Sequence, residues 1–185
     1  CPAENGGYDN HWLQFLVFDA VNLVGATAPQ FAFSADWAVE VPGAEPAGYD
    51  MWDSWNAWVS TDDGTTWSVL TPSSPPYTGS SSYAFGVEWG MGPGIAAYGA
   101  ASGGHTPCIF PLTAFIGQSN VKVRVAFCSD PAFSSIDACA TTWGLVVDSV
   151  RISDGATTLF SNDGVAGGWN GMGGPESPDV WVYEN

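Results

Sequence analysis

"DSWNAWVSTDDGTTWSVL", residues 53–70, joins two alternating segments through an Asp-Gly turn. Trp55, Ala57 and Val59 share one face of the first segment, and "TTWSVL" resumes the alternation after the turn. An Asp-Gly pair between two such segments is a strong hairpin signal, because its left-handed backbone suits the twist of the flanking strands. The turn does not supply the regularly spaced oxygen donors and final glutamate of an EF-hand. The stretch therefore predicts a β-hairpin with a structural turn.

Other segments show the same two-residue period of a strand. Strands are expected in residues 11–18, 30–41, 82–90, 120–130, 143–155 and 180–183. The 23 glycines and 13 prolines supply turns, and no long helical period is present. The pattern predicts an all-β fold, a two-sheet antiparallel jelly-roll β-sandwich. We expect a single jelly-roll domain over residues 1–185, with 1–12 and 160–185 as peripheral segments available for subunit contacts.

Two of these strands have a clearly apolar face, which we expect to point inward. In the first, the inward residues are Phe31, Phe33, Ala35, Trp37 and Val39. In the second, they are Val121, Val123, Val125 and Phe127. Both sets follow the alternation that half-buried strands require.

The chain is strongly acidic, with 19 acidic residues against three basic ones and a net charge of −16. Such a chain cannot neutralise phosphates, so nucleic acid is excluded as a partner and anionic membranes are disfavoured. Divalent cations are the natural counter-charge, although solubility alone also explains acidity. The longest apolar stretch is interrupted by polar residues, so no membrane span is expected. The absence of an initiator methionine and of a signal peptide favours a mature, secreted protein of the extracellular surface.

The four cysteines have no zinc-site spacing, and an even number in a secreted chain favours two disulfides. We expect Cys128–Cys139, which would close a short loop, together with Cys1–Cys108, which would anchor the N-terminus. The other two connectivities remain open. Lipidation of Cys1 is a competing hypothesis that would leave one cysteine unpaired.

Five blocks occur in a characteristic order along the chain. They are "VNLVGATAPQFAFSADWAVE", "STDDGTTWSVL", "PGIAAYGAASGG", "FPLTAFIGQSNVKVRVAFCSD" and "GLVVDSVRI". Together they resemble the jelly-roll module of immune inhibitor A-like (M6) metallopeptidases, which is similar to MAM and cleaved-adhesin domains. The resemblance covers about residues 20–152 and does not include a catalytic domain.

The resemblance implies a structural Ca²⁺ site. Its motif positions correspond to Glu40, Asp53 and Asp148, and the strand arginine of the family corresponds to Arg124. Ser149 stands where the family commonly has a second aspartate. Calcium takes six to eight hard oxygen ligands, which carboxylates on neighbouring strands supply together with loop carbonyls. The alternative is that these acids are solvated strand ends or pair with arginines.

The sequence contains no recognisable catalytic motif. "HExxH" and G-x-S-x-G are absent, and the glycine-rich segments have the wrong spacing for a phosphate loop. His11 and His105 are expected to be surface or packing residues. Carboxylate pairs for glycoside hydrolysis are uninformative at this level, because the fold decides their separation. We therefore expect a non-catalytic protein.

Two functions remain from different classes. The first is a structural or adhesive subunit of an extracellular filament or assembly that associates with copies of itself, because both ends carry aromatic, strand-like segments. The other interpretation of these segments is that both close the sandwich of this chain itself. The alternative is a carbohydrate-binding module in which exposed indole rings stack on a polysaccharide. The candidate contact residues are Trp52, Trp55, Trp58 and Trp89.

Overall fold

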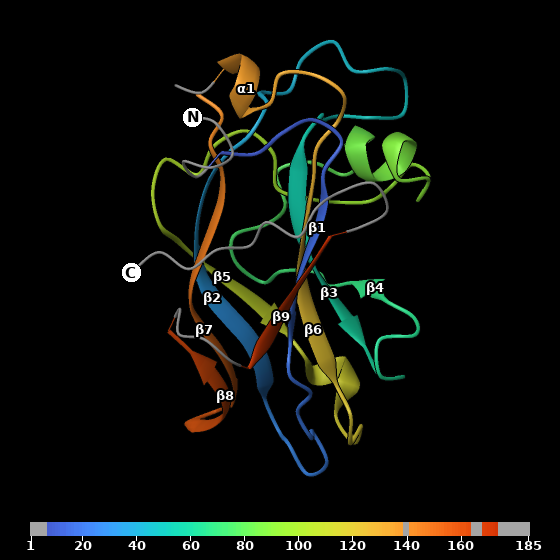
Figure 1. The fold of residues 1–185 in the computed structure, drawn as a ribbon. Helices are drawn as coiled ribbons and strands as arrows, with labels where there is room; N and C mark the ends of the chain where they lie inside the picture. The colour runs from blue at the N-terminus through green and yellow to red at the C-terminus, as the bar shows by residue number, and fades with distance from the viewer. Residues whose placement is uncertain (1–6, 139–140, 164–167, 174–185) are drawn as a thin grey trace.

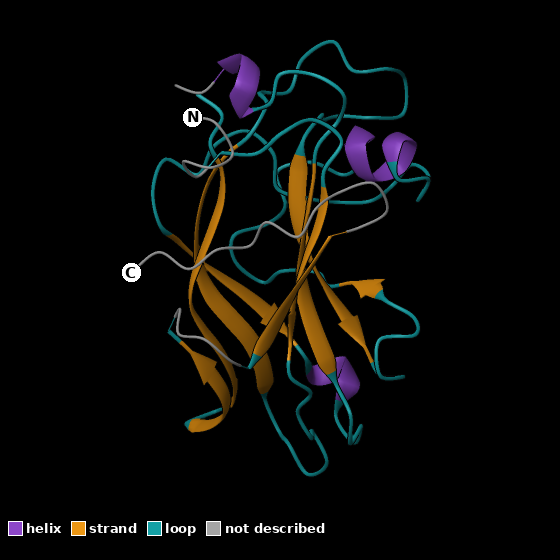
Figure 2. Ribbon diagram, viewed as in Figure 1, coloured by secondary structure: helices purple, strands orange, loops and turns teal. Residues whose placement is uncertain are grey.

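The protein is described by a computed structural model that covers residues 7–138, 141–163 and 168–173. Its strands form two antiparallel sheets (Figures 1 and 2). The five-stranded sheet has the order β4 (Ser68–Val69), β3 (Ser54–Ser60), β6 (Lys122–Cys128), β1 (Leu13–Phe18) and β9 (Trp169–Gly173). The four-stranded sheet has the order β5 (Thr106–Pro111), β2 (Pro29–Ala38), β7 (Gly144–Asp154) and β8 (Thr157–Asn162). The predicted two-sheet antiparallel sandwich is confirmed, and most connections cross from one sheet to the other, as in a jelly roll.

The helical segments are short. They are a π-helical turn η2 (Ala84–Glu88), a 3₁₀ turn η3 (Thr113–Phe115) and the four-residue helix α1 (Ser135–Ala138), shown in purple in Figure 2. None of the helices in the described ranges is long and apolar enough to cross a membrane.

The main core lies between the two sheets and is rich in aromatic rings. Both sets of residues predicted to face inward, on β2 and along β6, belong to this core, as do Trp55, Ala57 and Val59 of β3. The Trp55 side chain is fully buried, and its ring centroid lies 4.5 Å from that of Tyr98 and 5.1 Å from that of Trp37. The alternation read from the sequence therefore identified the buried faces of these strands correctly.

A second apolar cluster covers the outer face of the five-stranded sheet. It includes Trp58 of β3 and Phe85 of η2. The strand expected at 82–90 is wrong, because this segment forms a π-helical turn instead. Ser82 holds the turn: its hydroxyl accepts a hydrogen bond from the Phe85 amide at 3.2 Å, and its carbonyl accepts one from the Gly86 amide at 3.0 Å. The alternating residues of this segment predicted a strand because alternation is a local property. The packing of Phe85 against the outer face of the sheet decides its conformation instead.

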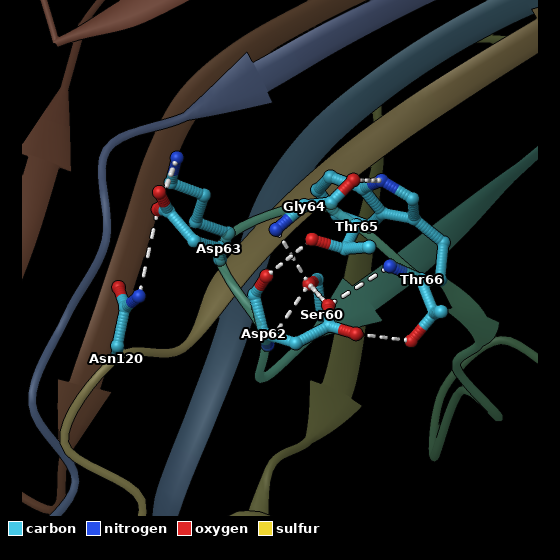
Figure 3. Close-up of polar contacts among 9 residues, drawn as sticks. Ser60, Asp62, Asp63, Gly64, Thr65, Thr66 and Asn120 are labelled. Atoms are coloured by element: carbon cyan, nitrogen blue, oxygen red, sulfur yellow. Dashed lines mark hydrogen bonds and ion pairs between the residues drawn. The ribbon is translucent and has the colours of Figure 1, made fainter.

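The predicted hairpin is present, and hydrogen bonds among the residues of its turn stabilise it (Figure 3). Asp62 is the hub of the turn: its carboxylate accepts hydrogen bonds from Ser60 Oγ at 2.8 Å and from the amide and hydroxyl of Thr66 at 2.9 and 2.6 Å. These bonds lower the pKa of Asp62 to about 2. Asp63 adopts a positive φ of 60° and pairs with Lys122 at 2.7 Å. The turn is structural, as predicted.

The N-terminal and C-terminal segments expected to be peripheral contribute to this sandwich instead. Tyr8 and Trp12 are 2% and 8% exposed and belong to the main core. Strand β1 lies between β6 and β9, and β8 and β9 complete the two sheets. The predicted terminal strand at 180–183 lies outside the described residues.

Neither of the predicted disulfides is formed in this structure. Cys108 and Cys128 are both free and buried. Cys108 packs in the core between the sheets, whereas Cys128 packs in the cluster on the outer face of the five-stranded sheet. Their expected partners, Cys139 and Cys1, lie outside the described residues.

Candidate metal centre

Three carboxylates meet at one end of the sandwich. Glu40, Asp53 and Asp130 each offer one oxygen, and these oxygens all lie within 4.8 Å of one another. Glu40 follows the end of β2, Asp53 immediately precedes β3, and Asp130 follows the end of β6. Strands β3 and β6 are antiparallel, so the start of one lies beside the end of the other. The cluster therefore joins segments that belong to both sheets.

The structure corrects one of the three predicted ligands. Glu40 and Asp53 come together as predicted, but Asp148 is not part of the cluster and Asp130 takes its place. Asp148 is exposed on β7, where it lies opposite Ser34 of the four-stranded sheet. Asp130 was missed because an acid after a strand is an ordinary solvated position. The usable signal was that "CSD" ends the strand that pairs with the segment after Asp53.

Hydrogen bonds hold two of the carboxylates in place. Asp53 Oδ2 accepts from the Tyr8 hydroxyl at 2.6 Å, and Asp53 Oδ1 accepts from the Asp130 amide at 2.7 Å. Asp130 Oδ1 accepts from the Ala132 amide at 2.9 Å. Glu40 Oε2 is buried and has no hydrogen-bond partner among the described residues. An orphaned carboxylate oxygen of this kind is costly, and a metal ligand bond would satisfy it.

The electrostatics of the cluster are unfavourable without a cation. Burial raises the pKa of Asp53 well above its ordinary value and also raises that of Asp130. Burial, with the added repulsion of Asp130 and Glu45, raises the pKa of Glu40 to about 7. Burial, and then the charge of Asp53, raises the pKa of the Tyr8 hydroxyl. Like charges that crowd together in a low-dielectric site disfavour ionisation, so the group as a whole resists carrying its full negative charge.

None of the three basic residues of the chain neutralises this cluster. Lys122 pairs with Asp63 at the hairpin turn. The Arg124 guanidinium lies over the rings of Phe15 and Trp67, 4.0 and 4.3 Å from their centroids, so it does not take the pairing role that we considered for it. Among the described residues, Arg151 donates a hydrogen bond to the Ala156 carbonyl at 3.5 Å and forms no ion pair. A divalent ion would supply the missing positive charge.

A pH dependence follows from the raised pKa of Glu40. Between its unfolded value of 4.5 and its folded value of about 7, the folded state binds more protons than the unfolded state. In chelator-treated protein, stability should therefore fall as the pH rises from 4.5 to 7 and should level off above that. Melting curves over this range would measure the trend, and Glu40→Gln should flatten it. An equally steep trend in Glu40→Gln would assign the effect to other acids.

The four tryptophans proposed for glycan contact divide into two pairs. Trp55 and Trp58 are 0% and 7% exposed, so their rings are core residues and the prediction is wrong for them. Trp52 and Trp89 are partly exposed. The Trp52 indole donates a hydrogen bond to the Gly43 carbonyl at 3.0 Å, and its ring meets Tyr83 edge-to-face at 4.9 Å.

Neither a scan against protein-family models nor a comparison with curated proteins yields a match for this chain. The resemblance to the M6 peptidase module therefore stays a prediction, and the functional conclusion depends on the geometry of the site itself.

Proposed function

We propose that this chain is a non-catalytic extracellular β-sandwich that acts as a structural or adhesive surface protein, with a structural Ca²⁺ at Glu40, Asp53 and Asp130. It associates with further copies of itself in a filament or another assembly. The observation that carries the proposal is the carboxylate cluster, which gathers three acids from both sheets with no Lys or Arg of the described residues in an ion pair with them. The resemblance to calcium-holding jelly-roll modules supports the same ion.

The ion has a structural role in this proposal because of where its ligands lie. Bound between the end of β2 and the segments that flank β3 and β6, it ties the two sheets together at one end of the sandwich. Carboxylates and loop carbonyls are the hard oxygen ligands that Ca²⁺ prefers, and the flexible geometry of its coordination suits loop donors. Loss of the ion leaves mutually repelling acids in the same place.

A hydrolytic role for the same acids is the competing interpretation. Glycoside hydrolysis needs two carboxylates that reach the scissile bond from opposite sides. Asp53 is fully buried and Asp130 is 4% exposed, and Asp53 is held by Tyr8 and by a backbone amide. Carboxylates that are enclosed in this way favour a structural ion over a substrate.

Self-association is supported by the open edges of the sheets. No further strand among the described residues pairs with the outer side of β8 or β9. Both edges expose an apolar side chain, Leu159 at 36% and Met172 at 52%. Phe160 of β8 contacts Phe18 of β1, the strand beside β9, so both edges border the same side of the sandwich. Unpaired strand edges with apolar residues favour strand addition by a second copy.

Size-exclusion chromatography tests this association. In the presence of Ca²⁺, which screens the net charge of −16, the protein should elute ahead of a 19.4 kDa monomer. Leu159→Glu combined with Met172→Glu should return it to the monomer, because charges on an edge strand oppose pairing. Val24→Glu, at a loop position that is 61% exposed, is the control and should behave as wild type. A wild-type protein that is monomeric at every concentration contradicts the proposal.

A tryptophan-based carbohydrate site is the second candidate, and it now depends on Trp52 and Trp89. The partial exposure of Trp52 beside the ring of Tyr83, which in turn contacts the ring of Tyr49, favours it. Retention on an immobilised polysaccharide should then fall in Trp52→Ala, whereas retention that no tryptophan variant changes removes this candidate.

A further inference from the structure

The outer face of the four-stranded sheet is hollowed into a groove with a mixed polar and apolar lining, separate from the carboxylate cluster. Its volume is about 380 Å³, and its lining comes from β2, β5 and β7. The residues that matter below are Gln30, Ala32, Ser34, Ile109, Ser149 and Arg151. A volume of this size lies within the range of small-molecule sites.

The strand register explains the hollow. Ala32 of β2 lies opposite Ile109 of β5 on one side and Arg151 of β7 on the other, so the smallest side chain forms the floor between two larger ones. The register of β2 against β7 shifts between Ala32 and Ser34, and Ser149 adopts a positive φ of 55°. A bulge of this kind redirects side chains locally, and such bulges are common beside functional sites.

Arg151 is the unusual feature of the groove. In a chain with 19 acidic residues, its exposed guanidinium makes no ion pair with any described carboxylate. The other two basic residues are engaged, Lys122 with Asp63 and Arg124 with aromatic rings. An arginine presents a rigid fork that matches a carboxylate with two parallel hydrogen bonds. The groove therefore offers one cationic side chain that can pair with a single carboxylate.

The side chains around Arg151 indicate the chemistry of the ligand beyond its carboxylate. Gln30, Ser34 and Ser149 offer amide and hydroxyl groups, of which the Ser34 hydroxyl also lies 3.3 Å from His105 Nδ1, and Pro107 and Ile109 form an apolar wall. The backbone of β2 is already paired with β5 and β7, and the outer side of β5 is bonded to Ser73 and Ser74. A peptide that adds as a strand would meet backbone that is already paired along β2 and at Ile109 of β5, which favours recognition of the ligand by side chains. Hydroxyl-rich ligands with apolar C–H faces fit this lining.

We propose that this groove binds a saccharide residue that carries a carboxylate, of the uronic acid type. The carboxylate pairs with the Arg151 guanidinium, the ring hydroxyls exchange hydrogen bonds with Gln30, Ser34 and Ser149, and a C–H face of the ring rests on Ile109. The net charge of −16 repels dense polyanions, so the preferred glycan carries isolated carboxylates among neutral sugars. The site acts independently of the calcium cluster.

The test is a titration of the full chain, followed by NMR amide shifts, with glucuronate, glucose and a short acidic peptide as probes. Glucuronate should shift the amides of β2 and β7 around Ala32 and Arg151. Glucose should bind about tenfold more weakly, because it lacks the charge-assisted pair. Arg151→Gln should lose about the same factor, and Arg151→Lys, which keeps the charge but not the fork, should be intermediate.

Two further variants separate binding from folding. Ala32→Val fills the floor of the groove with a residue that strands accept, so it should abolish glucuronate binding and leave the melting temperature unchanged. Lys122→Gln removes the cation at the hairpin turn and should bind as wild type. Asp130→Asn should also bind normally, which distinguishes this site from the calcium site. Equal binding of glucose and glucuronate, tighter binding of the peptide, or an unaffected Arg151→Gln overturns the proposal.

Discussion

Trp55→Ala is expected to lower the free energy of unfolding by about 4 kcal/mol, the largest effect of any single substitution considered for this protein. Trp55 is fully buried between the sheets. Its ring meets those of Phe33, Trp37 and Tyr98 at centroid distances of 5.8, 5.1 and 4.5 Å. Truncation removes the buried apolar surface of an indole and leaves a cavity that rigid aromatic neighbours do not fill.

Urea unfolding of Trp55→Ala and of Trp52→Ala would measure this effect. Trp52 is partly exposed, its indole donates a hydrogen bond to the Gly43 carbonyl and its ring meets Tyr83, so its loss should cost about 1 kcal/mol. The comparison also separates the two roles first considered for these tryptophans, because a core ring changes stability and a glycan-contact ring changes binding. A difference of less than about 1 kcal/mol between the variants would show that the core can repack around the missing indole.

Removal of calcium is expected to produce the second large effect. A ligand at one hundred times its dissociation constant stabilises the folded state by about 2.7 kcal/mol. For a chain of 185 residues, chelation should therefore lower the melting temperature by roughly 5 to 10 °C. The physical reason is that three acids within 4.8 Å of one another lose the cation that offsets their repulsion.

Two matched substitutions decide which acids hold the ion. Asp130→Asn removes one charge from the cluster, so it should abolish the response to chelation and melt at a similar temperature with and without Ca²⁺. Asp148→Asn changes an exposed acid on β7 and should respond to chelation as wild type does. Calorimetric scans of the three proteins would measure this. A wild-type melting temperature that is insensitive to chelation would contradict the calcium proposal. Loss of the response in Asp148→Asn would refute the assignment of Asp130 as a ligand.

The effects of calcium and pH are linked at the same residues. Protonation of Glu40, whose pKa is about 7 without an ion, competes with metal binding. Calcium should therefore stabilise the protein more at pH 8 than at pH 5. Acidification should release the ion from calcium-loaded protein, whereas acidification of the chelator-treated protein should relieve the repulsion among the acids.

Periodicity allowed a large part of the fold to be predicted. The inward faces of β2 and β6 and the hairpin of β3 and β4 were identified from alternation and one Asp-Gly pair, because both are local properties of a strand and a turn. The strand predicted at 82–90 was wrong, because the alternation of this segment is also compatible with a turn that packs Phe85 against the outer face of a sheet. For the two terminal regions the sequence left open whether they complete this chain's own sandwich or contact a second copy, because aromatic strands serve equally well inside one chain or between two.

The sequence by itself determined the strands, their buried faces and the excess of negative charge, since each depends on residue type and spacing along the chain. Only the tertiary structure decided which acids gather. Asp53 and Asp130 are far apart in sequence and meet because antiparallel pairing places the end of β6 beside the start of β3, and Glu40 joins them from the end of β2 in the other sheet. The same holds for Arg124, which lies against aromatic rings, and for Arg151, which lies beside Ala32 without an ion pair to any described carboxylate. Strand register and the packing of the two sheets depend on contacts between distant residues. They decide which of the many acids lie close enough together to form a site.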